Sequence, residues 1–231
     1  MSHDRILCAL DTADLGVALD LAESLAGTVG GLKIGKELFT AHGPDAVTRI
    51  RDAGHQVFLD LKFHDIPATV AGAVRAAAGL GCFVLTVHAS GGPEMLRAAT
   101  EAAGAAKPPP LVVGVTVLTS LDDGDLAAVG QSGPVADLVS RLARLARSCG
   151  LGGVVCSPRE IAALRAELGA DFRLIVPGVR PEWAGADDQK RVMTPAEAVA
   201  AGADYLVIGR PITRAADPAE AARRIADEIA G

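Results

Sequence analysis

The segment 58–69, FLDLKFHDIPAT, places charged side chains on an otherwise apolar strand. Asp60 and Lys62 alternate with large apolar residues, so a regular strand would direct both charged groups to the same face. A carboxylate and an ammonium are costly to bury unless each is paired, and a structural ion pair is one interpretation of this pattern. Asp65 follows in the next turn. The three charges together favour a catalytic array.

Eight short apolar runs alternate with Ala-rich helical segments, and these elements must position the charged residues. The predicted strands are Ile6–Leu10, Leu32–Ile34, Val57–Leu61, Phe83–Val87, Leu111–Leu118, Gly153–Cys156, Leu174–Val176 and Tyr205–Ile208. The predicted helices lie near Leu15–Leu25, Pro44–Ala53, Ala68–Leu80, Pro93–Ala105, Val135–Cys149, Arg159–Leu168, Pro195–Ala200 and Pro218–Ala230. Such alternation implies a parallel sheet. Eight units in 231 residues fit a closed (β/α)₈ TIM barrel better than an open, doubly wound sheet, so we predict an α/β fold with residues 1–231 as a single barrel domain.

Active sites of such barrels lie at the carboxyl ends of the strands. Polar residues or glycines stand at most of these predicted ends: Asp11, Lys33, Asp60 with Lys62, His88, Thr119 with Ser120, Gly178 with Arg180, and Gly209 with Arg210. Glycine lets the backbone approach a ligand closely, and an arginine can donate two hydrogen bonds to a phosphate. The seventh and eighth strand ends therefore predict a phosphate site, although an arginine such as Arg180 is also typical of a solvated surface.

The composition excludes some classes of protein. Half of the 231 residues are hydrophobic and only 3% are aromatic, so small aliphatic side chains must fill the core. The formal net charge of −6, with both signs mixed along the chain, gives no basic surface for nucleic acid. The N-terminus shows no signal-peptide pattern, and no apolar run reaches the roughly 20 residues of a membrane helix. The chain has four cysteines without a CxxC pair, Cys8, Cys82, Cys149 and Cys156. They indicate buried thiols in a reducing compartment, and we therefore predict a cytoplasmic protein.

Motifs of other enzyme classes do not occur in the sequence. The histidines show no HxH or HExxH spacing, and His88, which alone ends a strand, is more typical of a hydrogen-bonded structural residue. No GxSxG elbow, GxGxxG loop or Walker loop occurs. The sequence therefore disfavours a histidine metal centre, a serine nucleophile, nicotinamide chemistry and nucleoside triphosphate chemistry.

Several of these motifs resemble those of a known family. The segment DLKFHDIPATV, residues 60–70, resembles the DxKxxDI signature of orotidine 5′-phosphate decarboxylases. The likeness extends along most of the chain through ALD at Asp11, LKIGKELF at Lys33, VTVLTS ending at Ser120, PGVR at Arg180, DDQKRV around Gln189 and VIGRPIT at Arg210. The resemblance implies conversion of orotidine 5′-phosphate to uridine 5′-phosphate and carbon dioxide. It also implies no cofactor, no metal, and a homodimer with shared active sites.

The resemblance assigns a role to each matching residue. Asp11 and Lys33 would hold the ribose hydroxyls, and Lys33 would also complete the charge network. Asp60 would face the substrate carboxylate, and Lys62 would protonate the ring carbon that loses it. The remaining assignments are Asp65, Ile66 and Thr69 to the neighbouring subunit's site, Thr119 and Ser120 to the pyrimidine, and Arg180, Gln189, Gly209 and Arg210 to the phosphate.

Two long connections are candidates for lids over the ligand. Leu121–Gly133 is polar and contains glycine, and Pro181–Arg191 follows the seventh strand. Both are long for loops of a compact barrel. A variable surface loop is an equal alternative for the first segment, whereas the second contains Gln189 of the family pattern.

Two other functions compete with the decarboxylase. Related sugar-phosphate enzymes share the DxKxxD signature, but they use magnesium with an acidic ligand from the second strand, where this chain has Lys33. A non-catalytic barrel that binds a phosphorylated ligand would need the phosphate loops only. Such a protein gains nothing from the charges of Asp60, Lys62 and Asp65, whose burial costs stability.

Overall fold

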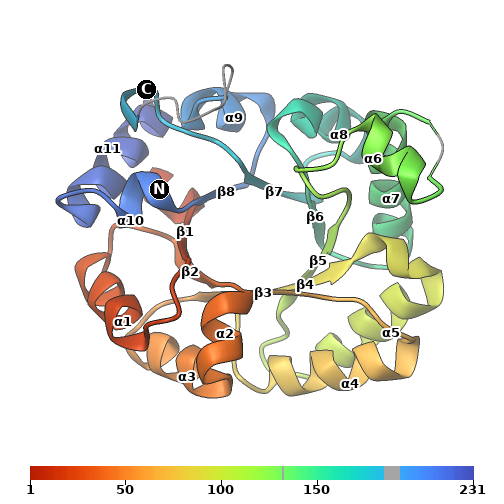
Figure 1. The fold of residues 1–231 in the computed structure, drawn as a ribbon, viewed down its shortest axis with the longest axis horizontal. Helices are drawn as coiled ribbons and strands as arrows, with labels where there is room; N and C mark the ends of the chain where they lie inside the picture. The colour runs from red at the N-terminus through yellow and green to blue at the C-terminus, as the bar shows by residue number, and fades with distance from the viewer. Residues whose placement is uncertain (132, 185–192) are drawn as a thin grey trace.

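The computed structural model describes residues 1–131, 133–184 and 193–231, which form a closed barrel of parallel strands ringed by helices (Figure 1). The strands follow one another around the ring in chain order, and β1 pairs with both β2 and β8, which closes it. Their bounds are β1 Ile6–Leu10, β2 Gly31–Ile34, β3 Val57–Phe63, β4 Val84–His88, β5 Leu111–Val115, β6 Gly153–Val155, β7 Arg173–Pro177 and β8 Tyr205–Ile208. The predicted (β/α)₈ barrel is confirmed.

The helices lie outside the strand ring. They are α1 Leu15–Ser24, α2 Lys36–His42, α3 Pro44–Asp52, α4 Pro67–Ala78, α5 Gly92–Gly104, α6 Asp123–Ala128, α7 Val135–Ser148, α8 Ile161–Leu168, α9 Pro195–Ala201, α10 Arg210–Thr213 and α11 Pro218–Ala230. Several begin with proline in the first turn, where its missing N–H costs nothing. Two of these helices also have a side-chain cap, because Thr194 accepts a hydrogen bond at α9 and Asp217 accepts one at α11.

Two apolar cores hold the barrel together. The larger core packs outward-facing strand residues against the helices and includes fully buried Ile6, Cys8 and Leu10 of β1. The smaller core contains Leu7 of the same strand together with Phe58. Alternate residues of β1 thus enter different cores, as the period of a strand requires. The inner core closes the barrel below the carboxyl ends of the strands, so polar side chains can gather only at the rim.

The structure departs from the predicted elements at some connections. The segment 121–133, predicted as a loop, contains helix α6. Asp122 and Asp125 form a reciprocal capping box there, which stabilises a short helix despite its polar sequence. Helices α2 and α10 were also not predicted, and both are short. No helix in the described part of the chain is long and apolar enough to cross a membrane.

Candidate active site

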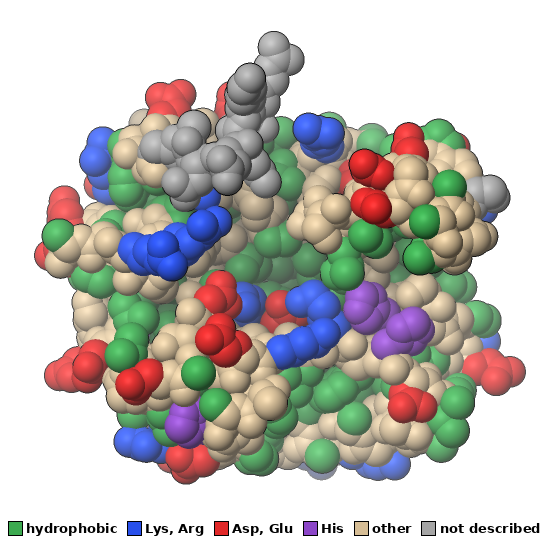
Figure 2. Space-filling view, in the orientation of Figure 1, with side chains coloured by type: hydrophobic (Ala, Val, Ile, Leu, Met, Phe, Trp, Pro, Cys, Tyr) green, Lys and Arg blue, Asp and Glu red, His purple; other side chains and the backbone are tan. Residues whose placement is uncertain are grey.

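A cavity of about 310 Å³ lies at the carboxyl ends of the strands. In the space-filling view it is the central hollow, with acidic and basic side chains around an apolar floor (Figure 2). The cavity brings together six of the predicted site residues: Asp11, Lys33, Asp60, Lys62, Thr119 and Gly209. These residues come from or follow β1, β2, β3, β5 and β8, so the barrel assembles the site from segments far apart in the sequence.

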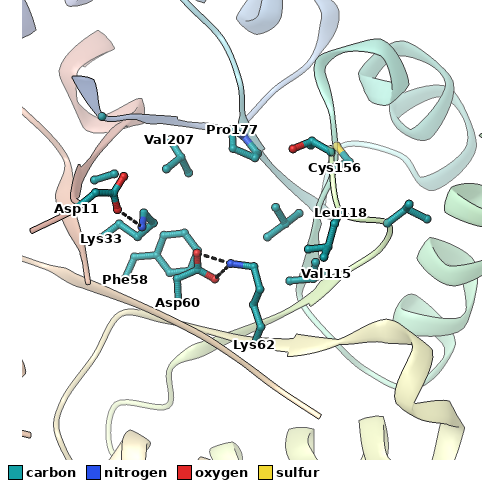
Figure 3. Close-up of a pocket in the computed structure, with 15 residues that line it drawn as sticks. Asp11, Lys33, Phe58, Asp60, Lys62, Val115, Leu118, Cys156, Pro177 and Val207 are labelled. Atoms are coloured by element: carbon teal, nitrogen blue, oxygen red, sulfur yellow. Dashed lines mark hydrogen bonds and ion pairs between the residues drawn. The ribbon is translucent and has the colours of Figure 1, made fainter. Parts of the chain in front are cut away.

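Asp60 and Lys62 form the most closely paired charges of the cavity (Figure 3). The Lys62 Nζ donates to both carboxylate oxygens of Asp60, at 2.8 Å to Oδ1 and 2.7 Å to Oδ2. The Asp60 side chain is 13% exposed and that of Lys62 is 23% exposed. Both groups are therefore largely withdrawn from water while they still line the cavity, and the prediction that they share a face is confirmed.

The strand that carries this pair is not regular. On β3, Leu59 pairs with Leu85 and Phe63 pairs with Val87 of β4, so three residues of β3 stand where β4 has one. Within this bulge Lys62 has a φ of 54°, a left-handed conformation that costs a non-glycine residue about 1–3 kcal/mol. Strict alternation, on which the shared face was predicted, is thus wrong here. The bulge aims both side chains at the cavity.

Asp11 and Lys33 make a second charged pair beside the first, since Lys33 lies on β2, which pairs with β3. The Lys33 Nζ donates to Asp11 Oδ1 at 3.1 Å, and Lys33 is 8% exposed. A Cβ atom added to Gly35 would lie 3.0 Å from this ammonium, so any larger residue would press on it. The cavity therefore holds two cations, each beside a carboxylate, and suits a ligand with both hydroxyl and anionic groups.

The seventh and eighth strand ends adjoin the cavity through Pro177, Val207 and Gly209. Gly178 has a φ of 80°, which a residue with a side chain rarely adopts. Arg180 is half-buried and Arg210 is exposed at the start of α10, and neither is among the residues that line the cavity. Gln189 lies outside the described residues, as does most of the predicted lid 181–191.

Asp65, Ile66 and Thr69 lie outside the cavity of their own chain. All three are exposed, and Ile66 retains 66% of its surface. Asp65 Oδ1 accepts a hydrogen bond from the backbone N–H of Ile66 at 2.6 Å, which fixes the carboxylate at the turn before α4. The structure therefore brings Asp60 and Lys62 together but does not bring Asp65 to them within one chain.

The segment after β5 separates the cavity from a larger groove of about 1320 Å³. Thr119 lines both, whereas Ser120 lines only the groove. Helix α6 contributes Asp123 to the groove wall. The two predicted pyrimidine contacts are thus adjacent to each other, with one at the cavity and one beside it.

Apolar residues of the cavity were not predicted as site residues. They include Phe58, Val115, Leu118 and Val155. Alternation along β5 could have indicated Val115, since inward-facing strand positions near the carboxyl end must line any cavity. Such a lining lowers the local dielectric and strengthens each charged interaction within it.

Burial dominates the surroundings of the cysteines and of His88. All four cysteines are buried and free, as predicted, and burial raises the pKa of the Cys8 thiol to about 12. His88 ends β4 beside His64, with 5.3 Å between the ring centroids. Burial, and then the charges of His64 and Lys36, lower the pKa of the His88 imidazole, which favours its neutral form.

Comparisons with known proteins identify the family. The family model described as "Orotidine 5′-phosphate decarboxylase / HUMPS family" matches residues 4–225. The orotidine 5′-phosphate decarboxylase of Paramagnetospirillum magneticum is 55% identical over 229 residues, which cover 97% of each chain. That of Anaeromyxobacter sp. (strain K) is 56% identical over 96% of this chain and 97% of its own. The crystal structure of orotidine 5′-phosphate decarboxylase from Lactobacillus acidophilus superposes with a TM-score of 0.88 at 35% identity, covering 98% of this chain and 99% of that one. The chain belongs to the orotidine 5′-phosphate decarboxylase / HUMPS family.

Proposed function

We propose that the cavity at the strand ends is where this chain decarboxylates orotidine 5′-phosphate, with Lys62 as the proton donor. The activity, the last step of uridine 5′-phosphate synthesis, follows from the family and from relatives that are 51–56% identical. The observation that carries the assignment of the site is the Lys62 ammonium, held 2.7–2.8 Å from the Asp60 carboxylate oxygens at the cavity wall.

The chemistry requires a fixed cation. Loss of carbon dioxide leaves an electron pair on a pyrimidine ring carbon, and no cofactor takes part in delocalising it. The Lys62 ammonium stabilises that charge and then donates a proton to the same carbon, which gives uridine 5′-phosphate. Asp60 lies beside the departing carboxylate and orients the ammonium. Repulsion between the two carboxylates raises the energy of the bound substrate.

The remaining side chains bind the ribose, base and phosphate. Asp11 and Lys33 contact the ribose hydroxyls, and their place on the cavity wall beside Asp60 and Lys62 supports this role. The pyrimidine contacts are assigned to Thr119 and Ser120, and the phosphate contacts to Arg180, Gln189, Gly209 and Arg210. Binding energy from the phosphate, remote from the reacting carbon, helps to assemble the site around the transition state.

A homodimer with shared active sites explains the position of Asp65. The carboxylate is exposed and absent from the cavity lining of its own chain, and exposed Ile66 follows it. Placing this turn against a second copy buries Ile66 and brings Asp65, Ile66 and Thr69 to the partner's cavity. The proposed setting is the cytoplasm, in keeping with four free cysteines.

Magnesium-dependent relatives are the alternative within the family. Those enzymes need an acidic ligand where this chain has Lys33, whose ammonium lies 3.1 Å from Asp11. A cation at this position repels a divalent metal. Protein dialysed against a strong chelator is therefore expected to convert orotidine 5′-phosphate to uridine 5′-phosphate at the rate of untreated protein, followed by the loss of substrate absorbance. Complete loss of activity that magnesium restores would place the chain with the sugar-phosphate enzymes.

Arg210 provides a test of the phosphate site. Replacing Arg210 by alanine is expected to weaken binding of uridine 5′-phosphate by about 1.5–3 kcal/mol, the value of a charge-assisted hydrogen bond. Arg214 is exposed at the other end of the same short helix and serves as the matched control. Arg214→Ala should leave the dissociation constant, measured by calorimetry, unchanged. Equal affinities of the Arg210→Ala variant and the parent would place the phosphate elsewhere.

A further inference from the structure

Thr86 links the two charged residues of β3 through a single hydroxyl. Thr86 lies on β4 and is fully buried, with 0% of its surface exposed. Its Oγ1 accepts a hydrogen bond from the backbone N–H of Lys62 at 2.8 Å and donates one to Asp60 Oδ1 at 3.0 Å. A hydroxyl is suited to this place because it can donate and accept at once.

The position of Thr86 in the sheet explains why this contact matters. Thr86 is the one residue of β4 that stands opposite the three bulged residues of β3, between the Leu59–Leu85 and Phe63–Val87 pairs. The bulge takes the Lys62 N–H out of the regular ladder, and the Thr86 hydroxyl supplies an acceptor for it. The same hydroxyl therefore fixes the backbone of Lys62 and also Asp60 Oδ1, an oxygen to which the Lys62 Nζ donates.

We infer that Thr86 is a positioning residue for the decarboxylation, holding Lys62 in its left-handed conformation and thereby setting the direction of its ammonium. This inference rests on the proposed role of Lys62 as proton donor. Lys62 has a φ of 54°, which persists only where surrounding contacts over-determine it. Without the hydroxyl, the Lys62 N–H and Asp60 each lose a partner. Lys62 then relaxes toward an ordinary negative φ, and its Nζ moves from the reacting carbon.

Removal of the hydroxyl is expected to affect turnover more than binding. The ribose and phosphate contacts come from other strands, so they survive a change in the direction of Lys62. Thr86→Val keeps the shape of the side chain and removes the hydroxyl. We expect kcat to fall by roughly 10–100-fold, as for loss of a hydrogen bond to a charged group, while KM changes by less than about threefold.

Three further variants separate positioning from stability. Thr86→Ser and Thr86→Ala both remove the methyl group, but only serine keeps the hydroxyl, so the kcat ratio of this pair reports the hydroxyl even if the valine variant does not fold. Thr116→Val is the matched control. Thr116 is also buried, at 4% exposure, and its Oγ1 donates to the Val155 carbonyl at 3.0 Å without contacting Asp60 or Lys62. Folded sites are counted by titration with uridine 5′-phosphate, and Lys62→Ala is assayed alongside.

We expect Thr86→Ser and Thr116→Val to have a kcat per folded site close to that of the wild type. Thr86→Ala and Thr86→Val should have a kcat lower by roughly 10–100-fold. Equal kcat values of the serine and alanine variants, or a valine variant that loses only stability, would overturn the role of Thr86. If Lys62→Ala is inactive and both hydroxyl-free Thr86 variants turn over normally, only the role of Thr86 is wrong. If Lys62→Ala turns over normally, the proton donor is wrong and the role of Thr86 falls with it.

Discussion

Replacing Lys62 by alanine is expected to lower kcat for orotidine 5′-phosphate by at least about 10⁴-fold. General acid catalysis contributes about 10²–10⁴-fold, and a cation aimed at developing charge contributes a further factor of about 10²–10³. Both contributions come from one ammonium, held 2.7–2.8 Å from Asp60. The measurement is single-turnover conversion of substrate to uridine 5′-phosphate.

Binding of the product should survive the same change in part. The proposed ribose and phosphate contacts lie on β1, β2, β7 and β8 or the segments after them, so affinity for uridine 5′-phosphate should remain measurable by calorimetry. Lys107→Ala is the matched control, since Lys107 is exposed in the turn before β5, at the other end of the barrel from the cavity. Turnover of Lys62→Ala within about tenfold of the parent would show that another group donates the proton.

Mixing two inactive variants is expected to restore activity if each active site is shared. In an Asp65→Ala chain the Lys62 remains, and in a Lys62→Ala chain the Asp65 remains. A mixed dimer then has one complete site, built from Lys62 of the first chain and Asp65 of the second, while its other site lacks both. Random exchange makes about half of the dimers mixed, so activity should rise from background to roughly a quarter of the wild-type level.

The exchange itself must be measured separately. Native mass spectrometry of chains that carry different tags gives the fraction of mixed dimers, and activity should increase in proportion to it. Mixing each variant with wild-type protein of the same concentration provides the control for dilution. Mixed dimers that remain at background activity would mean that Asp65 serves its own chain. The exposed turn at Ile66 would then need a different explanation.

The fold could be predicted from the sequence because each strand is a short apolar run between helices. Strands β1 and β8 have the predicted bounds, and the others differ by a few residues at their ends. The rim residues followed from the rule that barrel sites lie at the carboxyl ends of strands. Helix α6 was not predicted because it depends on a reciprocal capping box in a polar segment.

The finer geometry of the site could not be predicted from a periodic pattern. Periodicity assumes a regular strand, whereas the bulge between Leu59 and Phe63 depends on pairing with β4. The contact of Thr86 with Lys62 depends on the same pairing and has no local signal in the sequence. Asp65 shows a further limit of local reasoning, because its proposed partner groups belong to a second chain.

In the proposed reaction, a proton from Lys62 takes the place of the carboxylate of orotidine 5′-phosphate. A decisive measurement uses substrate labelled in the carboxyl carbon and follows release of labelled carbon dioxide together with formation of uridine 5′-phosphate. Wild-type protein should release one carbon dioxide for each uridine 5′-phosphate formed, and Lys62→Ala should release almost none. No release by the folded wild-type protein would contradict the proposed activity, and equal release by the two proteins would contradict the role of Lys62.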